Sequence, residues 1–330
     1  MFDKLNDRAY RWILATVWTQ HAGIARSLLA ICGLSTLVFS SVNTLIRPAA
    51  GTDGMFCAGP AEMSLWCLTP ANTHDLAKWA SILILGVAAS GWRPRLTALP
   101  MWWILFGNQS SLTVVDGGDQ IAAVLALLLI PISLTDGRRW HWQTSGPEGN
   151  SEHPVAALIA HVSIVVVQVQ VSFVYLNSCL AKLGVPEWLN GTAIYYWLRD
   201  PMFGPAGGLS DITNALMVLP IPAAIFTWGP LGLEFFLGIS IFLPRRVKLA
   251  LLPFGLLFHL GIAVTMGLWS FAFAMWAALL LALWPGGGAV TWATTIMTRM
   301  RRPELIDSKR SNGTQQNTEL EVVPPMHGPN

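Results

Sequence analysis

Long apolar runs are the feature that most constrains this chain. Residues 24–46 and 154–181 are each long enough for a helix that crosses a bilayer, which needs about 20 residues. Backbone groups find no water inside a bilayer, so a spanning segment of this kind must be helical. The composition agrees, because 53% of the residues are hydrophobic, 12% are charged and the mean hydropathy is +0.50. The sequence therefore predicts an all-α integral membrane protein.

Further apolar runs predict a polytopic helical bundle of about eight spans. The last run is too long for one crossing and fits a hairpin that turns near residues 267–270. The runs cover residues 24–46, 76–92, 96–106, 120–134, 154–181, 221–243 and 249–284. The third run is short and ends in GNQSS, which is compatible with a helix broken beside protein or water.

The basic residues predict the orientation of the bundle. Cytoplasmic loops are enriched in Lys and Arg. With cytoplasmic N and C termini, all Lys and Arg fall on the cytoplasmic side except Arg47, Lys78, Lys182 and Arg199. We therefore expect both termini inside. The basic residues form pairs and triplets rather than one continuous patch, which argues against nucleic acid as a partner.

Three parts follow from this pattern. Residues 1–23 are a mildly basic amphipathic segment that is too long and too aromatic for a cleavable signal, so we expect it to stay attached. Residues 24–290 form the transmembrane domain. Residues 291–330 lack a core-forming pattern, and we expect a disordered cytoplasmic tail.

Residues 175–205 concentrate polar and aromatic side chains at the outer end of a predicted span. Lys182 ends the apolar run and Trp188 follows it. A charged side chain inside a membrane costs on the order of 2.5 to 3.5 kcal/mol on insertion scales. Either the amine reaches the outer interface or pairs with Glu187, or a dry setting keeps it neutral, ready to accept a proton or attack a carbonyl.

A polar stripe runs along the same predicted helix. At 100° per residue, its members lie within about 40° of Gln168. They are His161, Ser172, Tyr175, Cys179 and Lys182. Such a stripe either forms hydrogen bonds to neighbouring helices or lines a cavity or proton path, and both interpretations stay open.

Two ionisable residues occupy similar, near-central depths on the following spans. Glu234 lies about ten residues from the basic stop at Arg245, and His259 lies about as far from Lys248. Ionisable groups at this depth are functional candidates, so we expect Glu234 and His259 to be partners. The alternative is a purely structural hydrogen bond.

The outer loops hold the remaining candidates. Asn108, Gln109 and Asp119 flank a glycine-rich turn and either cap a broken helix or face a ligand. Cys57 and Cys67 favour a structural disulfide in an oxidising compartment. Cys32 and Cys179 lie in apolar runs, where cysteine is usually an inert small residue. No metal site is predicted.

Several short motifs resemble the horizontally transferred transmembrane domain (HTTM) family, which includes the vitamin K-dependent gamma-carboxylases and the bacterial sporulation-delaying protein B group. The principal motif is AKL at 181–183, WLNG at 188–191 and WLRDPMFGP at 197–205. The weaker motifs are GNQS at 107–110, GGD at 117–119, FHL at 258–260 and LWSF at 268–271. The similarity covers roughly residues 20 to 290. The Cys57 and Cys67 loop and the NGTAIYY segment at 190–196 look closest to the sporulation-delaying protein B group.

This resemblance implies a function and a site. In the carboxylases the matching lysine looks like the base that deprotonates vitamin K hydroquinone, which makes Lys182 the candidate base and carries His259 over as a further catalytic candidate. Glu234 joins them as a catalytic candidate because of its depth in the membrane. The implied substrate- or cofactor-binding residues are Asn108, Gln109, Asp119, Tyr175, Trp188 and Tyr195. The sporulation-delaying protein B group is implied to mature a secreted peptide toxin, a bacteriocin, in the bacterial inner (cytoplasmic) membrane.

Three functional hypotheses follow. The first is a maturation factor that acts on a peptide toxin precursor with a small partner of the sporulation-delaying protein A type. The second is a quinol-linked membrane enzyme related to the carboxylases, with menaquinol as its cofactor. The third is a non-enzymatic membrane chaperone or immunity protein.

Overall fold

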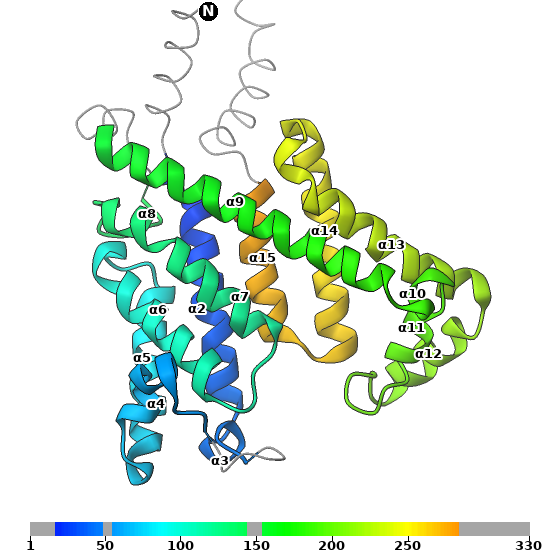
Figure 1. Cartoon of the computed structure of the whole chain (residues 1–330), viewed down its shortest axis with the longest axis horizontal. Helices are drawn as coiled ribbons and strands as arrows, with labels where there is room; N and C mark the ends of the chain where they lie inside the picture. Colours follow the sequence, from blue (N-terminus) through cyan, green and yellow to red (C-terminus); the bar gives the residue numbers. More distant parts are fainter. Residues whose placement is uncertain (1–16, 49–54, 144–153, 284–330) are drawn as a thin grey trace, which may run out of the picture. The chain divides into compact units, whose positions relative to one another are not determined.

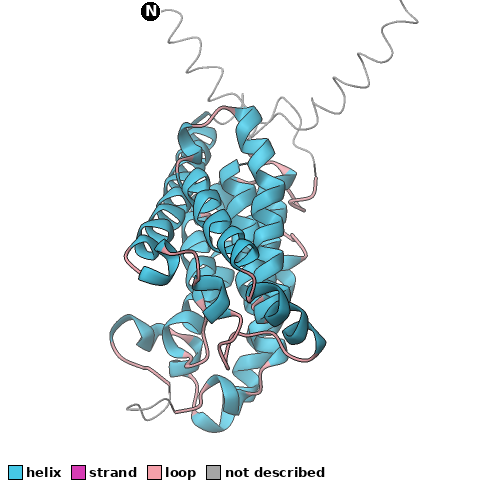
Figure 2. Cartoon of the chain, turned by 90° about the vertical axis from the view of Figure 1, so that its right-hand side faces the viewer, coloured by secondary structure: helices cyan, strands magenta, loops and turns pink. Residues whose placement is uncertain are grey.

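Every secondary-structure element in the described part of the chain is a helix. The computed structural model describes residues 17–48, 55–143 and 154–283, and Figure 2 shows helices joined by loops throughout them. The all-α prediction is confirmed. Most of the predicted N-terminal segment and the predicted disordered tail lie outside the described residues.

Four helices are long and apolar enough to cross a membrane (Figure 1). They are α2 (Gln20–Phe39), α9 (Pro154–Leu183), α13 (Pro220–Gly238) and α14 (Arg245–Met266). Two shorter apolar helices accompany them, α7 (Gly117–Leu128) and α15 (Trp269–Leu283). These helices support a membrane protein, whereas eight spans and cytoplasmic termini stay predictions.

The other helices lie between these six in the sequence. The longer ones are α5 (His74–Ala89), α6 (Pro94–Ser111), α8 (Ile130–Thr135) and α12 (Gly208–Met217). The shortest α-helices are α3 (Val42–Leu45), α4 (Leu65–Leu68), α10 (Pro186–Leu189) and α11 (Ala193–Trp197). Three 3₁₀ turns complete the set: η1 (Gly59–Met63), η2 (Ala71–Thr73) and η4 (Ser240–Phe242).

Two details of the predicted runs differ from the structure and one agrees. The broken helix expected after residue 106 is wrong, because α6 continues to Ser111 and the Leu112 N–H closes its last turn on the Asn108 carbonyl. The run 120–134 is divided between α7 and α8 at Leu129. The predicted hairpin is confirmed, since α14 ends at Gly267, whose φ of 74° suits glycine, and α15 begins two residues later.

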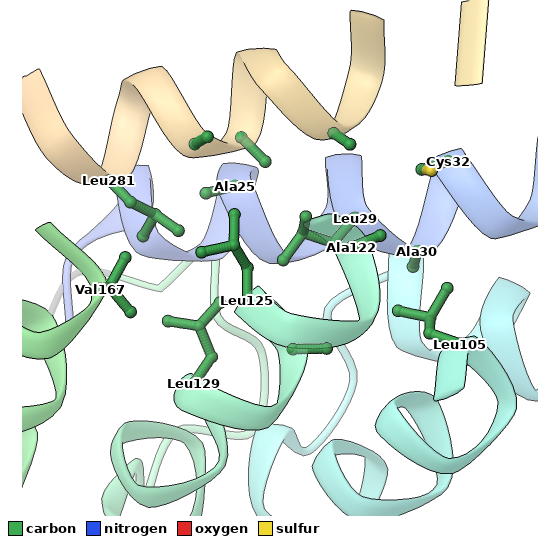
Figure 3. Close-up of a cluster of buried hydrophobic side chains, with 14 of the residues drawn as sticks. Ala25, Leu29, Ala30, Cys32, Leu105, Ala122, Leu125, Leu129, Val167 and Leu281 are labelled. Carbon is green, nitrogen blue, oxygen red and sulfur yellow. The ribbon is translucent and has the colours of Figure 1, made fainter. Parts of the chain in front are cut away.

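The core is built around α2. This helix packs against α15, α5 and α7, and Figure 3 shows its Ala25, Leu29 and Ala30 among side chains of the surrounding helices. Alanines in α15 and α7 face the same core. Small side chains let helix backbones approach closely, which gives van der Waals contact where lipid offers no hydrophobic driving force. The core therefore depends on close packing of small residues.

A second group of helices carries Lys182, Glu234 and His259, the candidates for chemistry. Helix α9 contacts α8, α15 and α13, and α13 in turn contacts α14. The segment between α9 and α13 docks on α13 through two hydrogen bonds. The Trp228 indole N–H donates to the Trp188 carbonyl at 3.0 Å, and the Ile194 N–H donates to the Thr227 hydroxyl at 3.3 Å.

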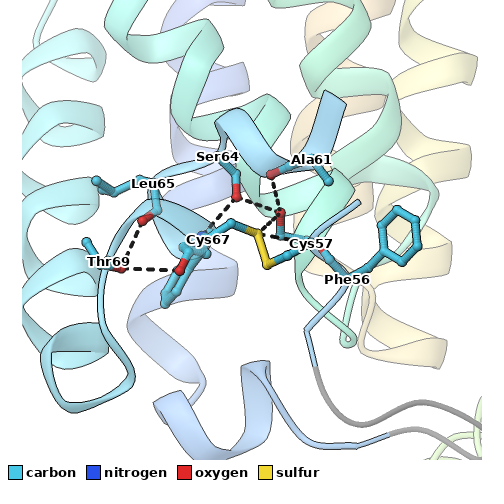
Figure 4. The surroundings of a disulfide bond; sticks show 9 residues. Phe56, Cys57, Ala61, Ser64, Leu65, Cys67 and Thr69 are labelled. Carbon is cyan, nitrogen blue, oxygen red and sulfur yellow. Dashed lines mark hydrogen bonds between the residues drawn. A yellow bond between two sulfur atoms is a disulfide. The ribbon is translucent and has the colours of Figure 1, made fainter. Parts of the chain in front are cut away.

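The predicted disulfide is present between Cys57 and Cys67 (Figure 4). It closes the loop that contains η1 and α4. The Ser111 hydroxyl donates to the Ser64 hydroxyl oxygen at 2.7 Å, and the Phe56 N–H donates to the Ser111 carbonyl at 3.1 Å. The loop is thus fastened to the end of α6. Cys32 and Cys179 are buried free thiols.

A buried polar cluster joins the first half of α2, the end of α5 and the start of α6. Arg26, at the start of the first predicted span, is buried and donates to the Ala88 carbonyl at 3.3 Å and to the Thr97 hydroxyl at 2.6 Å. His141, in the loop after α8, is buried with its ring Nε2 3.2 Å from the Ser27 hydroxyl. Burial, with smaller contributions from Arg26 and Arg138, lowers the pKa of His141 from 6.5 to about 4.

This pKa predicts a loss of stability in mild acid. An unfolded chain binds a proton at His141 near pH 6.5 and the folded chain only near pH 4, so the histidine's contribution is complete above pH 6.5 and falls as the pH drops toward 4. Thermal unfolding in detergent at several pH values should show a shallower decline for His141→Gln than for the native chain across this window. Equal pH slopes for the two proteins would contradict the assignment.

Candidate functional site

The candidate site is an ion pair between two packed candidate spans. Lys182 lies in the last turn of α9, and Glu234 lies on α13. The Lys182 Nζ is 2.6 Å from Glu234 Oε1 and 2.5 Å from Oε2. It also donates to the Ser178 hydroxyl at 2.7 Å, and that hydroxyl is 3.3 Å from Glu234 Oε2. The three side chains form one closed hydrogen-bonded group.

Helix geometry explains why Ser178 belongs to this group. Residues four apart lie on the same side of a helix, one turn from each other. Ser178 therefore stands directly below Lys182 on α9, and the packing of α9 on α13 brings Glu234 against both. The hydroxyl fixes the direction of the amine, so its position depends on two helices rather than on one long side chain.

Burial makes this pair unusual. The Glu234 side chain is only 6% exposed and that of Lys182 is 22% exposed. The Trp188 ring covers the amine, with Nζ 5.2 Å from the ring centroid, a distance suited to a cation–π contact. Removing charges from water is costly unless they are paired and hydrogen-bonded. Here the carboxylate, the hydroxyl and the indole together offset that cost.

Two expected pairings are wrong. Lys182 is paired with Glu234 rather than with Glu187, and Glu234 does not pair with His259. The His259 Nδ1 instead lies 2.8 Å from the Gly255 carbonyl oxygen, one turn earlier on α14. Consecutive spans suggested a partner on the next helix, whereas Glu234 is reached from α9, which also packs on α13.

Tyr175 and His259 form a separate buried contact. Their ring centroids are 6.1 Å apart in an edge-on arrangement, and both side chains are at most 2% exposed. Tyr175 is seven residues before Lys182 on α9, a distance of about 10 Å along the helix axis. Its hydroxyl has no hydrogen-bond partner among the described residues. The contact lies below the ion pair and is distinct from it.

The predicted polar stripe packs mainly against protein. His161, Ser172, Tyr175 and Cys179 are buried, as expected for a face that contacts neighbouring helices. A cleft of about 440 Å³ lies instead along the adjoining face of α9, beside Gln170, Asn177 and Ser178. Ser178 is therefore both part of the ion-pair group and part of the cleft wall.

Among the described residues, the hydrogen bonds of the Lys182 amine go to Ser178 and Glu234 and not to the other predicted residues. Asn108 is fully buried and accepts a hydrogen bond from the Trp66 indole at 3.0 Å, while Gln109 is partly buried beside it on α6. Asp119 accepts from the Thr36 hydroxyl at 3.2 Å in the first turn of α7. Tyr195 lies on α11, with the Arg199 guanidinium 3.7 Å from its ring centroid. The gathering of Asn108, Gln109 and Asp119 around Lys182 stays a prediction.

Ser178 and Asp116 are functional candidates that the sequence predictions missed. The spacing of four between Ser178 and Lys182 was a usable signal. Asp116 is the N-cap of α7, and its carboxylate accepts hydrogen bonds from the N–H groups of Gly118 and Asp119. In return, the Asp119 carboxylate accepts a hydrogen bond from the Asp116 N–H. An acidic residue three positions before another, ahead of an apolar run, is the signature of this reciprocal cap.

The fold and the buried pair together define an all-α membrane protein with a charged centre between two candidate spans. The sporulation-delaying protein SdpB of Bacillus subtilis (strain 168) is 33% identical over 270 residues, which are 81% of this chain and 82% of that protein. The uncharacterized protein YitO of the same strain is 35% identical over 287 residues, 86% of this chain and 92% of that protein. The chain belongs to the SdpB family. No family model and no solved structure matches it.

A double-mutant cycle tests the coupling of the ion pair. Glu234→Gln and Lys182→Met should each lower the thermal unfolding midpoint, because each leaves a buried charge without its partner. The double variant should recover part of the loss, with a coupling free energy of about 2 kcal/mol. Additive losses would mean that the two side chains do not interact.

Proposed function

We propose that this chain is an integral membrane factor for the maturation of a secreted peptide toxin. Membership of the SdpB family carries the proposal, because the resemblance of residues 181–205 implies a maturation role for that group. The candidate spans support an action within or at the surface of a membrane. We place the protein in the bacterial inner membrane with about eight spans, and its partners would be the toxin precursor and a small protein of the sporulation-delaying protein A type.

The ion pair supplies acid–base chemistry to this function. As an ammonium, Lys182 has no lone pair, so it becomes a base only by passing a proton to the Glu234 carboxylate 2.5 Å away. The free amine then accepts a proton from the substrate, which leaves the ammonium beside a neutral carboxylic acid.

The surroundings of the pair suit a substrate that arrives from one side. Glu234 is almost fully buried, whereas Lys182 keeps an exposed fraction and lies beneath the Trp188 ring. We assign the outward-facing role to Lys182 and Trp188 and the proton-storing role to Glu234. His259 and Tyr175, at the deeper contact, would position α9 against α14.

Lys182→Met tests this role. The variant should reach the membrane in normal amount and yield no mature toxin, because methionine has an unbranched side chain of similar length but no ionisable group. Mass spectrometry of the cognate peptide, made with and without the variant, measures the outcome. Lys78→Met is the matched control, since Lys78 is a second lysine predicted on the outer side, where its amine donates to the Ser40 carbonyl at 2.7 Å and lies 5.8 Å from the Trp79 ring centroid.

Normal maturation with Lys182→Met would overturn the proton-transfer role and favour the non-enzymatic chaperone or immunity protein. Loss with both Lys182→Met and Lys78→Met would point to a general effect of outer lysines. Glu234→Gln should also abolish maturation, because the amine then has no group to receive its proton.

The cleft on α9 favours a quinol-linked enzyme as the second candidate. Gln170, Asn177 and Ser178 place amide and hydroxyl groups beside apolar side chains such as Phe173 and Met275, a set that fits an aromatic ring with two oxygen atoms. Menaquinol, the cofactor suggested by the wider carboxylase-like resemblance, would supply reducing equivalents when bound. The chain's own residues would orient the ring, and Ser178 would connect it to Lys182.

Quinone analysis separates this candidate from the first. Solvent extraction of the purified protein should release menaquinone in near-stoichiometric amount, and Gln170→Leu should reduce that amount. Gln20→Leu is a control at the start of α2, outside the cleft lining. Protein that contains no quinone but matures the toxin would exclude the second candidate and leave the first intact.

A further inference from the structure

A second cavity, separate from the Lys182 pair, opens among the ends of several helices. Its volume is about 970 Å³, and its lining does not include Lys182 or Glu234. It is bounded by the end of α2, the start of α7, the turn between α14 and α15 and the loop at Met202 and Phe203. On the predicted topology all four segments lie at the outer side of the membrane.

The lining combines a large apolar surface with two carboxylates. Phe39, Phe203 and Trp269 contribute aromatic surface, and Asp116 and Asp119 contribute the acidic groups. The salt bridges among the described residues are Arg138 with Asp136 and Lys182 with Glu234, so neither aspartate has a basic side chain as an ion-pair partner. The cavity therefore offers negative charge beside apolar walls.

The hydrogen bonds of the two aspartates indicate that both act as acceptors. Asp116 accepts from two backbone N–H groups and, at 2.6 Å, from the Ser270 hydroxyl. Asp119 accepts from the Thr36 hydroxyl and from the Asp116 N–H. Burial and the neighbouring Asp116 raise the pKa of Asp119 from 3.8 to about 7, so the negative charge of the lining rests mainly on Asp116. The helix dipole offsets only about half an elementary charge at the N-terminus of α7.

The cavity is held by features that fix its walls. A Cβ on Gly118 would lie 2.5 Å from the Phe271 Cα, so only glycine allows α7 to approach the start of α15 this closely. The Asp200 carboxylate accepts the N–H groups of Met202 at 2.8 Å and Phe203 at 3.1 Å, which directs that loop into the lining. The same segment of sequence, residues 175–205, thus carries both Lys182 and part of the cavity.

We propose that this cavity binds an apolar peptide segment that carries one cationic side chain. Charge complementarity selects the occupant, because an ammonium or guanidinium beside Asp116 and Asp119 would supply the missing countercharge while apolar neighbours cover the aromatic walls. The inference rests on the proposed function in one respect, that the ligand is the toxin precursor. It assigns recognition to the cavity and chemistry to Lys182.

Binding of synthetic peptides tests the inference without the natural substrate. The probes are short, uncharged-end, fluorescent Leu/Ala peptides with a central lysine, norleucine or glutamate, and the full chain is held in nanodiscs of zwitterionic lipid. Fluorescence anisotropy should show the lysine peptide binding about tenfold more tightly than the norleucine peptide, with the glutamate peptide weakest. Equal binding of lysine and norleucine peptides, or the same preference in nanodiscs without protein, would overturn the proposal.

Asp116→Asn locates the preference. Asparagine is as good an N-cap as aspartate, so the helix start is kept while one charge is removed. The variant should lose most of the tenfold difference, whereas Glu62→Gln, which removes an exposed outer acid in η1, should keep it. Asp119→Asn provides a second variant if Asp116→Asn unfolds at a lower temperature. Retention of the full preference in both folded aspartate variants would place the cation elsewhere and overturn the proposal.

Lys182→Met distinguishes this inference from the proposed function. It should bind the lysine peptide as tightly as the native chain, even though maturation is lost. Normal maturation with normal peptide preference would remove the role of Lys182 and leave the cavity standing. Lost maturation in Lys182→Met, together with no peptide preference in the native chain, would overturn the role of the cavity and leave the role of Lys182 standing.

Discussion

Close contact between small side chains on α2 and α15 is the constraint on which the rest of the structure depends. In an apolar solvent, burying apolar groups gives helices no advantage over lipid, so stability comes from packing and from hydrogen bonds. Ala25, Ala30 and the alanines of α15 allow α2 to lie in the middle of the described helices. Helices α7 and α9 then pack around this pair, and α9 in turn is placed against α13. The position of Lys182 therefore follows from contacts made many residues away.

The Lys182 and Glu234 pair combines a structural and a chemical property. Its charges are shielded from water by the protein, and its proton has two places to reside that are 2.5 Å apart. Ser178 and Trp188 hold the amine in place beside the carboxylate, and they come from α9 and from the segment that follows it. Proton exchange would thus require little rearrangement, which is the advantage of a preorganised site.

Sequence patterns predicted the elements better than their contacts. Apolar run length located α2, α9 and α13 and the α14–α15 hairpin, because these depend on local composition and on a glycine at the turn. The disulfide was predicted from the position and spacing of its cysteines, and Lys182 became a candidate through the family resemblance of residues 181–205. The partner of Lys182 could not be predicted, since Glu234 is 52 residues away in the sequence and no local pattern indicates that α9 packs on α13. The continuous helix α6 was missed because its polar end, GNQSS, finds partners in the η1–α4 loop, such as Ser64 for Ser111.

The bond between Cys57 and Cys67 has a consequence for biogenesis. It closes a short loop, and a disulfide of this kind contributes on the order of 2 to 3 kcal/mol to the free energy of unfolding. Thiols oxidise only after they leave the reducing cytosol. The loop that is fastened to the end of α6 would therefore reach its final shape after insertion, so that export of the outer face and completion of its fold are successive events. A protein assigned to the maturation of another chain would itself need an oxidative step to be complete.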